Sequence, residues 1–323
     1  MPAEWRPACR GARWERQAGY RRQGPALRRG RARRAVDPPG PLRHKLTPLM
    51  VIVAGLAGIY VIVAVLLWGL QERITFPAPR APLPNPTQTI GYGERIELRM
   101  QDGTRLVGWY LRAAKTAAAA GGEGAAKTPA LLWFYGNGET IGAIWPIIRD
   151  FRPQNAGLLV LDYPGYGASE GRATEAGMYE AADLAYNALA SRPDIDPRRI
   201  YAYGRSLGSA AATHTAASHE VAGLILESPF TSARGMAARH YRIFPAFLVR
   251  IGLDNIGRMP RIHCPTLVFH GTADVLVPIK MGRDVAAAAG GPVDFVMIEG
   301  AGHNDTYDLG GDVYRDKLAA FVK

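Results

Sequence analysis

The sequence predicts an α/β fold: a mostly parallel sheet with helices on both faces and a short cap insertion, preceded by one transmembrane helix. Three observations lead to this prediction. Short apolar runs alternate with helical patterns from residue 131 onward, a hairpin pattern precedes them, and an uncharged apolar segment lies at residues 49–70. Strands that are apolar on both faces and alternate with helices are typical of a parallel sheet covered on both sides.

The net charge of +11 belongs mainly to one end of the chain. Residues 1–48 hold 13 Lys and Arg against 3 acidic residues, a net of +10, whereas the other residues hold 26 and 25, a net of +1. This tail is rich in Arg, Pro, Gly and Ala without a sustained apolar period, so we expect it to be disordered. Two alternatives stay open for this tail: nucleic-acid binding around Trp5 and Trp14, or a true translation start at Met50. Because residues 49–323 are nearly neutral, we do not expect a nucleic-acid partner.

The apolar segment 49–70 is predicted to anchor the chain in a membrane. Its 22 residues carry no charge, and a helix of this length spans the roughly 30 Å of a bilayer core. A buried core helix is the alternative. The segment is longer than the apolar part of a signal peptide and no cleavage site follows, so we expect an uncleaved anchor. The basic flank before it predicts a cytoplasmic N-terminus and an exported C-terminal domain; a start at Met50 would remove that asymmetry.

A linker at residues 71–90 follows the anchor, and one folded domain is expected over 91–323. Prolines over 77–87 predict an extended spacer. Two alternating segments, 94–101 and 104–112, flank Asp102-Gly103 and predict a β-hairpin. The low-complexity run 113–128 is predicted to be a surface loop.

The rest of the domain is expected to alternate between strands and helices. The predicted strands lie at 131–135, 158–161, 199–203, 224–226, 267–270 and 295–298. The predicted helices lie at 141–151, 174–190, 207–217, 278–288 and 307–322. A longer insertion at 229–260 interrupts this alternation and predicts a small cap.

Two serines occur in G-x-S-x-G patterns, at 167–171 and 204–208. A nucleophile elbow needs a strand directly before the serine and a helix directly after it, so that the serine is exposed at the carboxyl edge of the sheet. Ser206 lies between a predicted strand and an alanine-rich helix. Ser169 follows a loop, so we expect it to have a structural role. Ser206 is therefore the candidate nucleophile.

A serine nucleophile needs a base and an acid that orients the base. Among the seven histidines, His303 follows the last predicted strand and so reaches the sheet edge of Ser206, whereas His270 ends a strand and is expected to be structural. Asp274 follows the preceding strand and completes the chain order Ser, Asp, His. The other carboxylates near these strands are expected to have ordinary surface, cap or structural roles, with Glu227 as the first alternative acid. They are Glu227, Asp294 and Asp305.

The tetrahedral intermediate of acyl transfer needs two hydrogen-bond donors for its oxyanion. The backbone N–H of Leu207, directly after the nucleophile, is one candidate. The second is the N–H of Asn137 in the loop after the first parallel strand, where Gly136 allows close backbone approach. A plain glycine turn is the alternative for this loop.

Together these motifs resemble the α/β-hydrolase superfamily, and more narrowly the membrane-anchored serine hydrolases related to lysophospholipases and monoacylglycerol lipases. The segments that carry the resemblance are QERITFP (71–77), FYGNG (134–138), DYPGYGASEG (162–171), GRSLGS (204–209), ESPFTS (227–232), PTLVFHGTAD (265–274) and GH (302–303). The resemblance implies an eight-stranded sheet, a triad of Ser206, Asp274 and His303, and no metal or organic cofactor. The family usually has histidine where Tyr135 stands, a departure that bears on the oxyanion loop.

The predicted activity is hydrolysis of carboxylic esters or thioesters, lipid esters among them, through an acyl-enzyme. A peptidase or amidase of the same fold and a non-catalytic membrane-tethered binding protein are the alternatives. Apolar cap residues would either line an acyl pocket or pack the cap onto the sheet. They are Met236, Tyr241, Phe244, Phe247 and Leu248. Two cysteines, Cys9 and Cys264, match no disulfide framework or metal motif.

Overall fold

The computed structural model describes residues 43–114 and 126–323. The predictions for the tail and for most of the 113–128 loop therefore lie outside the described residues. The compact unit that holds the sheet comprises Leu56–Lys323 and includes the second part of helix α1.

Helix α1 runs without interruption over Arg43–Thr75, five residues beyond the predicted end of the anchor. Its portion Thr47–Thr75 contains an 18-residue window with a mean hydropathy of 2.8 and is long and apolar enough to cross a membrane, consistent with a single-pass anchor. The helix continues past residue 70 because its last turns are bonded to the rest of the unit. For example, Glu72 pairs with Arg172 at 2.7 Å.

The predicted Pro-rich linker at 71–90 includes the last five residues of α1, and the segment after them packs on the domain. Phe76 and Leu83 are buried in the core, and the carbonyl of Pro79 accepts a hydrogen bond from Gly167 N–H at 2.7 Å. A short helix, α2 (Pro86–Ile90), ends the segment. Residues 76–85 therefore lie between α1 and α2 outside any helix or strand, and they pack on the domain over most of their length.

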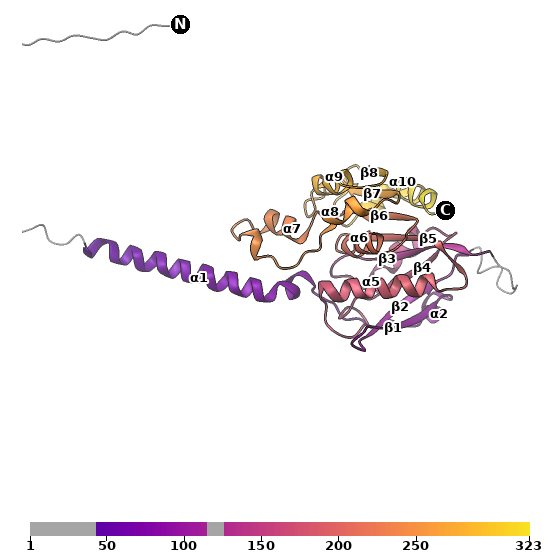
Figure 1. Ribbon diagram of the computed structural model, residues 1–323, viewed down its shortest axis with the longest axis horizontal. Coiled ribbons are helices and arrows are strands. Elements are labelled where there is room, and N and C mark those ends of the chain that lie inside the picture. Colours follow the sequence, from indigo (N-terminus) through magenta and orange to yellow (C-terminus); the bar gives the residue numbers. More distant parts are fainter. Residues whose placement is uncertain (1–42, 115–125) are drawn as a thin grey trace, which may run out of the picture. The chain divides into compact units, whose positions relative to one another are not determined.

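The sheet has eight strands in the order β1-β2-β4-β3-β5-β6-β7-β8, which confirms the predicted fold class (Figure 1). The predicted hairpin forms the antiparallel pair β1–β2, and β2 is also antiparallel to β4, whereas all other pairs are parallel. The strands are β1 (Glu94–Arg99), β2 (Arg105–Leu111), β3 (Thr128–Phe134), β4 (Gly157–Leu161), β5 (Ile195–Arg205), β6 (Gly223–Glu227), β7 (Thr266–Gly271) and β8 (Val293–Ile298).

Helices cover both faces of the sheet, as predicted for a parallel arrangement (Figure 1). On one face α4 (Ile141–Phe151) packs against α10 (Thr306–Phe321). On the other, α5 (Glu175–Ala190) packs against α6 (Gly208–Ser218), with α9 (Ile279–Ala287) farther along the sheet. The parallel strands β3 to β7 are buried almost throughout and form the core.

The cap leaves the sheet after β6 and returns at β7. It contains α7 (Ala233–His240), a 3₁₀ turn η1 (Ala246–Leu248), α8 (Asn255–Arg258) and a second 3₁₀ turn η2 (Met259–Arg261). α8 packs against α6, whereas α7 projects away from the sheet (Figure 1). The cap therefore has a base joined to the domain and a tip at residues 241–250.

Candidate active site

Ser206 lies in a sharp turn between β5, which ends at Arg205, and α6, which begins at Gly208. Its φ of +50° is in the left-handed region that a non-glycine residue rarely adopts. A Cβ on Gly208 would lie 2.2 Å from the carbonyl oxygen of Phe134, and one on Gly204 would lie 2.4 Å from the carbonyl oxygen of Gly208. The two glycines are needed because the elbow brings the strand and the helix into backbone contact.

The structure brings Ser206, His303 and Asp274 together in one hydrogen-bonded chain. Nε2 of His303 is 2.9 Å from the Ser206 hydroxyl, and Nδ1 is 2.7 Å from Oδ2 of Asp274. Asp274 follows β7 and His303 lies in the loop between β8 and α10, so both reach the sheet edge where β5 ends. This is the geometry in which an imidazole removes a proton from serine while a carboxylate fixes its tautomer.

The Asp274 carboxylate is buried and well supplied with donors. Its Oδ1 accepts hydrogen bonds from Leu276 N–H at 3.0 Å and Val277 N–H at 2.7 Å. Burial alone would raise the pKa of Asp274, but the hydrogen bonds from His303 and Val277 outweigh it and hold the pKa below its ordinary value. Asp274 is therefore ionised at neutral pH, as an acid that stabilises an imidazolium must be.

The other candidates occupy different surroundings. Ser169 is buried and donates to the carbonyl of Asp162 at 2.7 Å. His270 is buried beside Asp274 but bonds to the carbonyl of Val277 at 2.8 Å. Glu227 accepts a hydrogen bond from Tyr314 at 2.8 Å and lies in the core.

The remaining two carboxylates also bond elsewhere. Asp294 pairs with Lys317 at 2.7 Å, and Asp305 accepts from Gly302 N–H at 2.6 Å. Among the acidic side chains weighed as partners of His303, only Asp274 has a hydrogen bond to its ring in the described part of the chain.

Asn137 and Leu207, whose N–H groups are the candidate oxyanion donors, both line the cavity next to Ser206. Within residues 43–114 and 126–323, neither N–H donates a hydrogen bond, so both are available to a ligand. The side chain of Asn137 is bonded at both its nitrogen and its oxygen, because its amide donates to the carbonyl of Thr75 at 2.7 Å and its Oδ1 accepts from Tyr166 at 2.8 Å. These bonds fix the loop that carries Asn137.

Comparison with known proteins bears on the family. The family described as serine aminopeptidase, S33, matches residues 126–255. The uncharacterized protein Rv2307c of Mycobacterium tuberculosis is 34% identical over 283 residues, which cover 87% of this chain and 96% of the relative. Human alpha/beta hydrolase domain-containing protein 17B is 34% identical over 196 residues, 59% of this chain and 65% of the relative.

Solved structures agree. The Pyrococcus furiosus esterase Pf2001 superposes with a TM-score of 0.61 over 76% of this chain and 96% of that chain, at 16% identity, which shows a shared fold. The chain belongs to the α/β-hydrolase superfamily. The superfamily and the esterase-like fold support hydrolase activity.

Tyr135, at the position where the resembling family usually has histidine, supports the loop that carries Asn137 by hydrogen bonds of its own. Its hydroxyl donates to Oδ1 of Asp162 at 3.1 Å and accepts from Tyr163 N–H at 3.2 Å. Asp162 in turn accepts from the N–H of Ile141 at the start of α4. The buried phenol therefore joins the start of the loop to the end of β4.

Sequence reasoning missed one residue of this hydrolase site, Arg205. Its guanidinium is 2.5 Å from Oε1 of Glu139, in the loop that carries Asn137, and 3.3 Å from Oε1 of Glu227 in β6. It also donates to the carbonyl of His303 at 3.1 Å and to Oδ1 of Asn304 at 2.7 Å. Burial alone would lower the pKa of Arg205, but the two carboxylates raise it, so the group stays charged.

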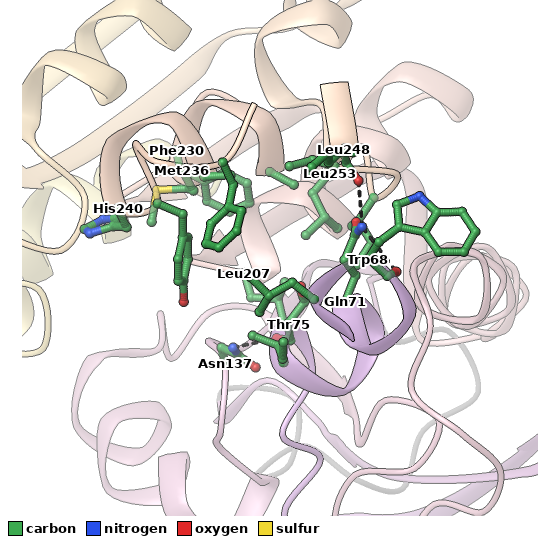
Figure 2. Close-up of a pocket in the computed structure, with 18 of the residues that line it drawn as sticks. Trp68, Gln71, Thr75, Asn137, Leu207, Phe230, Met236, His240, Leu248 and Leu253 are labelled. Carbon is green, nitrogen blue, oxygen red and sulfur yellow. Dashed lines mark hydrogen bonds between the residues drawn. The ribbon is translucent and has the colours of Figure 1, made fainter. Parts of the chain in front are cut away.

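A cavity of about 540 Å³ adjoins Ser206 in the hydrolase (Figure 2). Leu207 and Asn137 lie at one end of it, while Phe230, Met236 and Leu253 project into it from the domain and the cap. Trp68 and Gln71 of α1 border it opposite the cap. The apolar cap residues therefore line a pocket beside Ser206, except Phe247, which is 77% exposed.

Proposed function

We propose that this α/β-hydrolase is a serine hydrolase that cleaves carboxylic esters or thioesters through an acyl-enzyme. The observation that carries the proposal is the hydrogen-bonded chain of Ser206, His303 and Asp274 beside two unbonded N–H groups. An isolated serine at a left-handed φ has many structural explanations. A serine bonded to an imidazole that is itself bonded to a buried carboxylate has the geometry of an activated nucleophile.

The reaction proceeds in two halves. The Ser206 hydroxyl attacks the acyl carbonyl carbon as Nε2 of His303 takes its proton, and the N–H groups of Asn137 and Leu207 bind the resulting oxyanion. The intermediate collapses, and His303 returns the proton to the departing alkoxide or thiolate. Water then attacks the acyl-enzyme as His303 takes one of its protons. When the second intermediate collapses, His303 returns this proton to Oγ of Ser206 and the carboxylic acid leaves.

The pocket favours ester or thioester substrates over amino-terminal peptide cleavage. An aminopeptidase must hold the free ammonium group of its substrate, for which an acidic side chain is the usual partner. Among the described residues that line the cavity there is no Asp or Glu. Its lining is mainly aliphatic and aromatic, which suits an uncharged acyl group.

The proposal extends to location. Helix α1 would anchor the hydrolase as a single-pass protein, with the N-terminal tail in the cytoplasm and the catalytic domain exported. In sealed vesicles of known sidedness, a protease added from the exported side should cleave the domain and leave α1. Cleavage only from the cytoplasmic side would reverse the orientation without affecting the chemistry.

Labelling with a fluorophosphonate probe tests the activity, because the probe reacts only with an activated serine. The wild-type chain should be labelled and Ser206→Ala should not. Ser191→Ala is the matched control, since Ser191 is exposed at the end of α5 and should leave labelling unchanged. Labelling that survives Ser206→Ala would refute the nucleophile, and a folded wild-type chain that is never labelled would favour a non-catalytic binding protein.

A substrate panel then separates esterase from peptidase. p-Nitrophenyl acyl esters and acyl thioesters should be turned over, with kcat/KM rising with acyl length because the pocket is apolar. Aminoacyl anilides should be poor substrates. Preferential turnover of the anilides would make the peptidase alternative correct.

A further inference from the structure

One wall of the cavity beside Ser206 is not part of the α/β-hydrolase fold at all but belongs to helix α1. Six of its residues line the cavity: Ala64, Leu67, Trp68, Gln71, Ile74 and Thr75. Their spacing of three and four places them on one face of the helix. Leu67 on this face is half-buried, whereas its neighbour Leu66 is 55% exposed. We call this set the α1 stripe.

The α1 stripe is held against the cap by specific contacts. The side-chain amide of Gln71 donates to the carbonyl of Leu248 at 2.7 Å (Figure 2), and its oxygen accepts from Arg250 N–H at 2.7 Å. The Arg250 guanidinium lies over the Trp68 ring, 4.4 Å from its centre. Gln71 thus bonds to the cap backbone on either side of Val249. These two bonds hold α1 and the cap, which form opposite walls of the cavity, at a fixed distance.

The cap tip also contacts α1 at Tyr60, within the apolar segment 49–70. Tyr60 donates to the carbonyl of Ile243 at 2.9 Å, and its ring stacks on Phe244 with 5.4 Å between centres. Tyr60 is 15 residues before Thr75 in the helix, which corresponds to about 22 Å along its axis. A cap in contact with Tyr60 therefore lies beside the part of α1 that is apolar enough for a bilayer.

The composition of the cap tip fits contact with lipid. Ile243 and Phe247 are 73% and 77% exposed. Residues 233–250 contain four arginines and no acidic residue. Exposed apolar side chains together with arginines are typical of segments at the membrane interface, where the arginines meet anionic headgroups. The open side of the cavity thus lies between two elements that both suit a lipid environment.

We propose that the α1 stripe is the acyl-chain subsite, so that the anchor helix sets which acyl lengths the enzyme accepts. The inference rests on the proposed serine hydrolase function. With the ester or thioester carbonyl at Ser206, near the Thr75 end of the stripe, the chain runs between α1 and the cap toward Ala64. These two ends are 11 residues apart, about 16 Å along the helix, which suits a long chain. The substrate is an acyl ester or thioester whose chain is drawn from the surrounding leaflet.

Substitution of Leu67 tests the subsite in the full-length chain reconstituted in phosphatidylcholine vesicles. Leu67→Trp narrows the cavity, whereas the matched control Leu66→Trp places the same ring on the exposed neighbouring position. kcat/KM is measured for acetyl, octanoyl and hexadecanoyl p-nitrophenyl esters. For Leu67→Trp, we expect kcat/KM for the hexadecanoyl ester to fall on the order of tenfold. This is the effect expected when about two methylene groups of the acyl chain lose their contact with the cavity wall. The acetyl ester should be unaffected, and Leu66→Trp should match the wild type.

The unchanged acetyl ester also reports that Leu67→Trp is folded and that its Ser206 is active. Equal losses on all three esters, or equal effects of Leu66→Trp and Leu67→Trp, would overturn the subsite while leaving the hydrolase intact. Absence of Ser206-dependent turnover of any ester in the wild type would instead refute the proposed function. A second readout is the rate of labelling by ethyl and by dodecyl fluorophosphonate, for which only the dodecyl rate should fall in Leu67→Trp.

Discussion

The guanidinium of Arg205 lies 2.5 Å from the carboxylate of Glu139. This ion pair joins the residue directly before the candidate nucleophile to the loop that carries Asn137. The same guanidinium reaches Glu227 in β6 and the carbonyl of His303. One buried cation therefore connects the loop that carries Asn137, the end of β6 and the loop that carries His303.

We expect Arg205→Lys to impair kcat more than KM. The ammonium group of lysine keeps the charge but loses the planar fork that holds several partners at once. The oxyanion loop and the His303 loop should then lose their common support, and kcat should fall about 10- to 100-fold. Steady-state kinetics on an acetyl ester measure this split, with Arg198→Lys as the control because its side chain is 88% exposed.

Arg205→Met should in addition lower the free energy of unfolding. It leaves the Glu227 carboxylate, which is 0% exposed, without its counter-charge. Losing one partner of a buried ion pair costs about 3–5 kcal/mol. Denaturant unfolding measures the loss, and the double variant Arg205→Met/Glu227→Gln should recover part of it. No recovery would mean that Arg205 stabilises the fold independently of Glu227.

Asp274→Asn should reduce kcat on the order of 10⁴-fold with little change in KM. An amide next to Nδ1 of His303 favours the wrong tautomer and no longer stabilises the imidazolium. Ester hydrolysis is the measurement, and Asp294→Asn, whose carboxylate pairs with Lys317 at the surface, is the control. Full activity of Asp274→Asn would move the acid elsewhere, first to Glu227.

Gly208→Ala and Gly142→Ala should have opposite effects on stability. A Cβ on Gly208 would lie 2.2 Å from the Phe134 carbonyl, so the elbow must open and both labelling and folding should suffer. Gly142 is exposed in α4 and a Cβ there would meet nothing closer than 4.0 Å. Alanine there should stabilise the helix by about 0.5–1 kcal/mol. Thermal unfolding and probe labelling of both variants test the contrast.

His270 should make stability fall as the solution becomes acidic. Burial lowers its pKa below the ordinary 6.5, despite the opposing bond to the Val277 carbonyl and the nearby Asp274. Below about pH 6.5 the unfolded chain therefore takes up a proton at this residue before the folded chain does, so protonation favours unfolding. His270→Gln should flatten the decline of Tm between pH 7.5 and the lowered pKa, whereas the exposed His263→Gln should not.

The elbow and the positions of the candidate triad residues could be predicted because each depends on local signals. A strand before Ser206, a helix after it, and loops after the last two strands are all readable from short segments, and parallel strands bring those loops to one edge. The buried hydrogen bonds and ion pairs that hold the elbow and these loops together were not predictable in this way. Arg205 meets Glu139, Glu227 and Asn304, which are far apart in the sequence. A charged residue at the end of a buried strand was its only local signal.

The extent of α1 shows the same limit. Hydropathy falls at Gln71, so a span ending at residue 70 is what composition alone predicts. The helix continues to Thr75 because Gln71 and Glu72 bond to residues about 100 or more positions away. A hydropathy profile contains no information about such partners. It therefore places the end of the anchor at residue 70, although the helix continues from there and bonds to the domain.

The hydrogen bond from the Asn137 side chain to the Thr75 carbonyl has a practical consequence for biochemistry on this enzyme. The usual way to prepare a tethered hydrolase is to cut off the hydrophobic helix and purify the remainder from aqueous buffer. Here a cut after residue 70 would remove Ala64, Leu67 and Trp68 from the cavity wall, and a cut at the end of α1 would also remove the Thr75 carbonyl that holds Asn137. We expect such a fragment to fold but to have a lower kcat and less selectivity among acyl lengths. Its kinetics would therefore differ from those of the intact chain. Detergent micelles or nanodiscs containing the intact chain are therefore the setting in which rates and specificity should be measured.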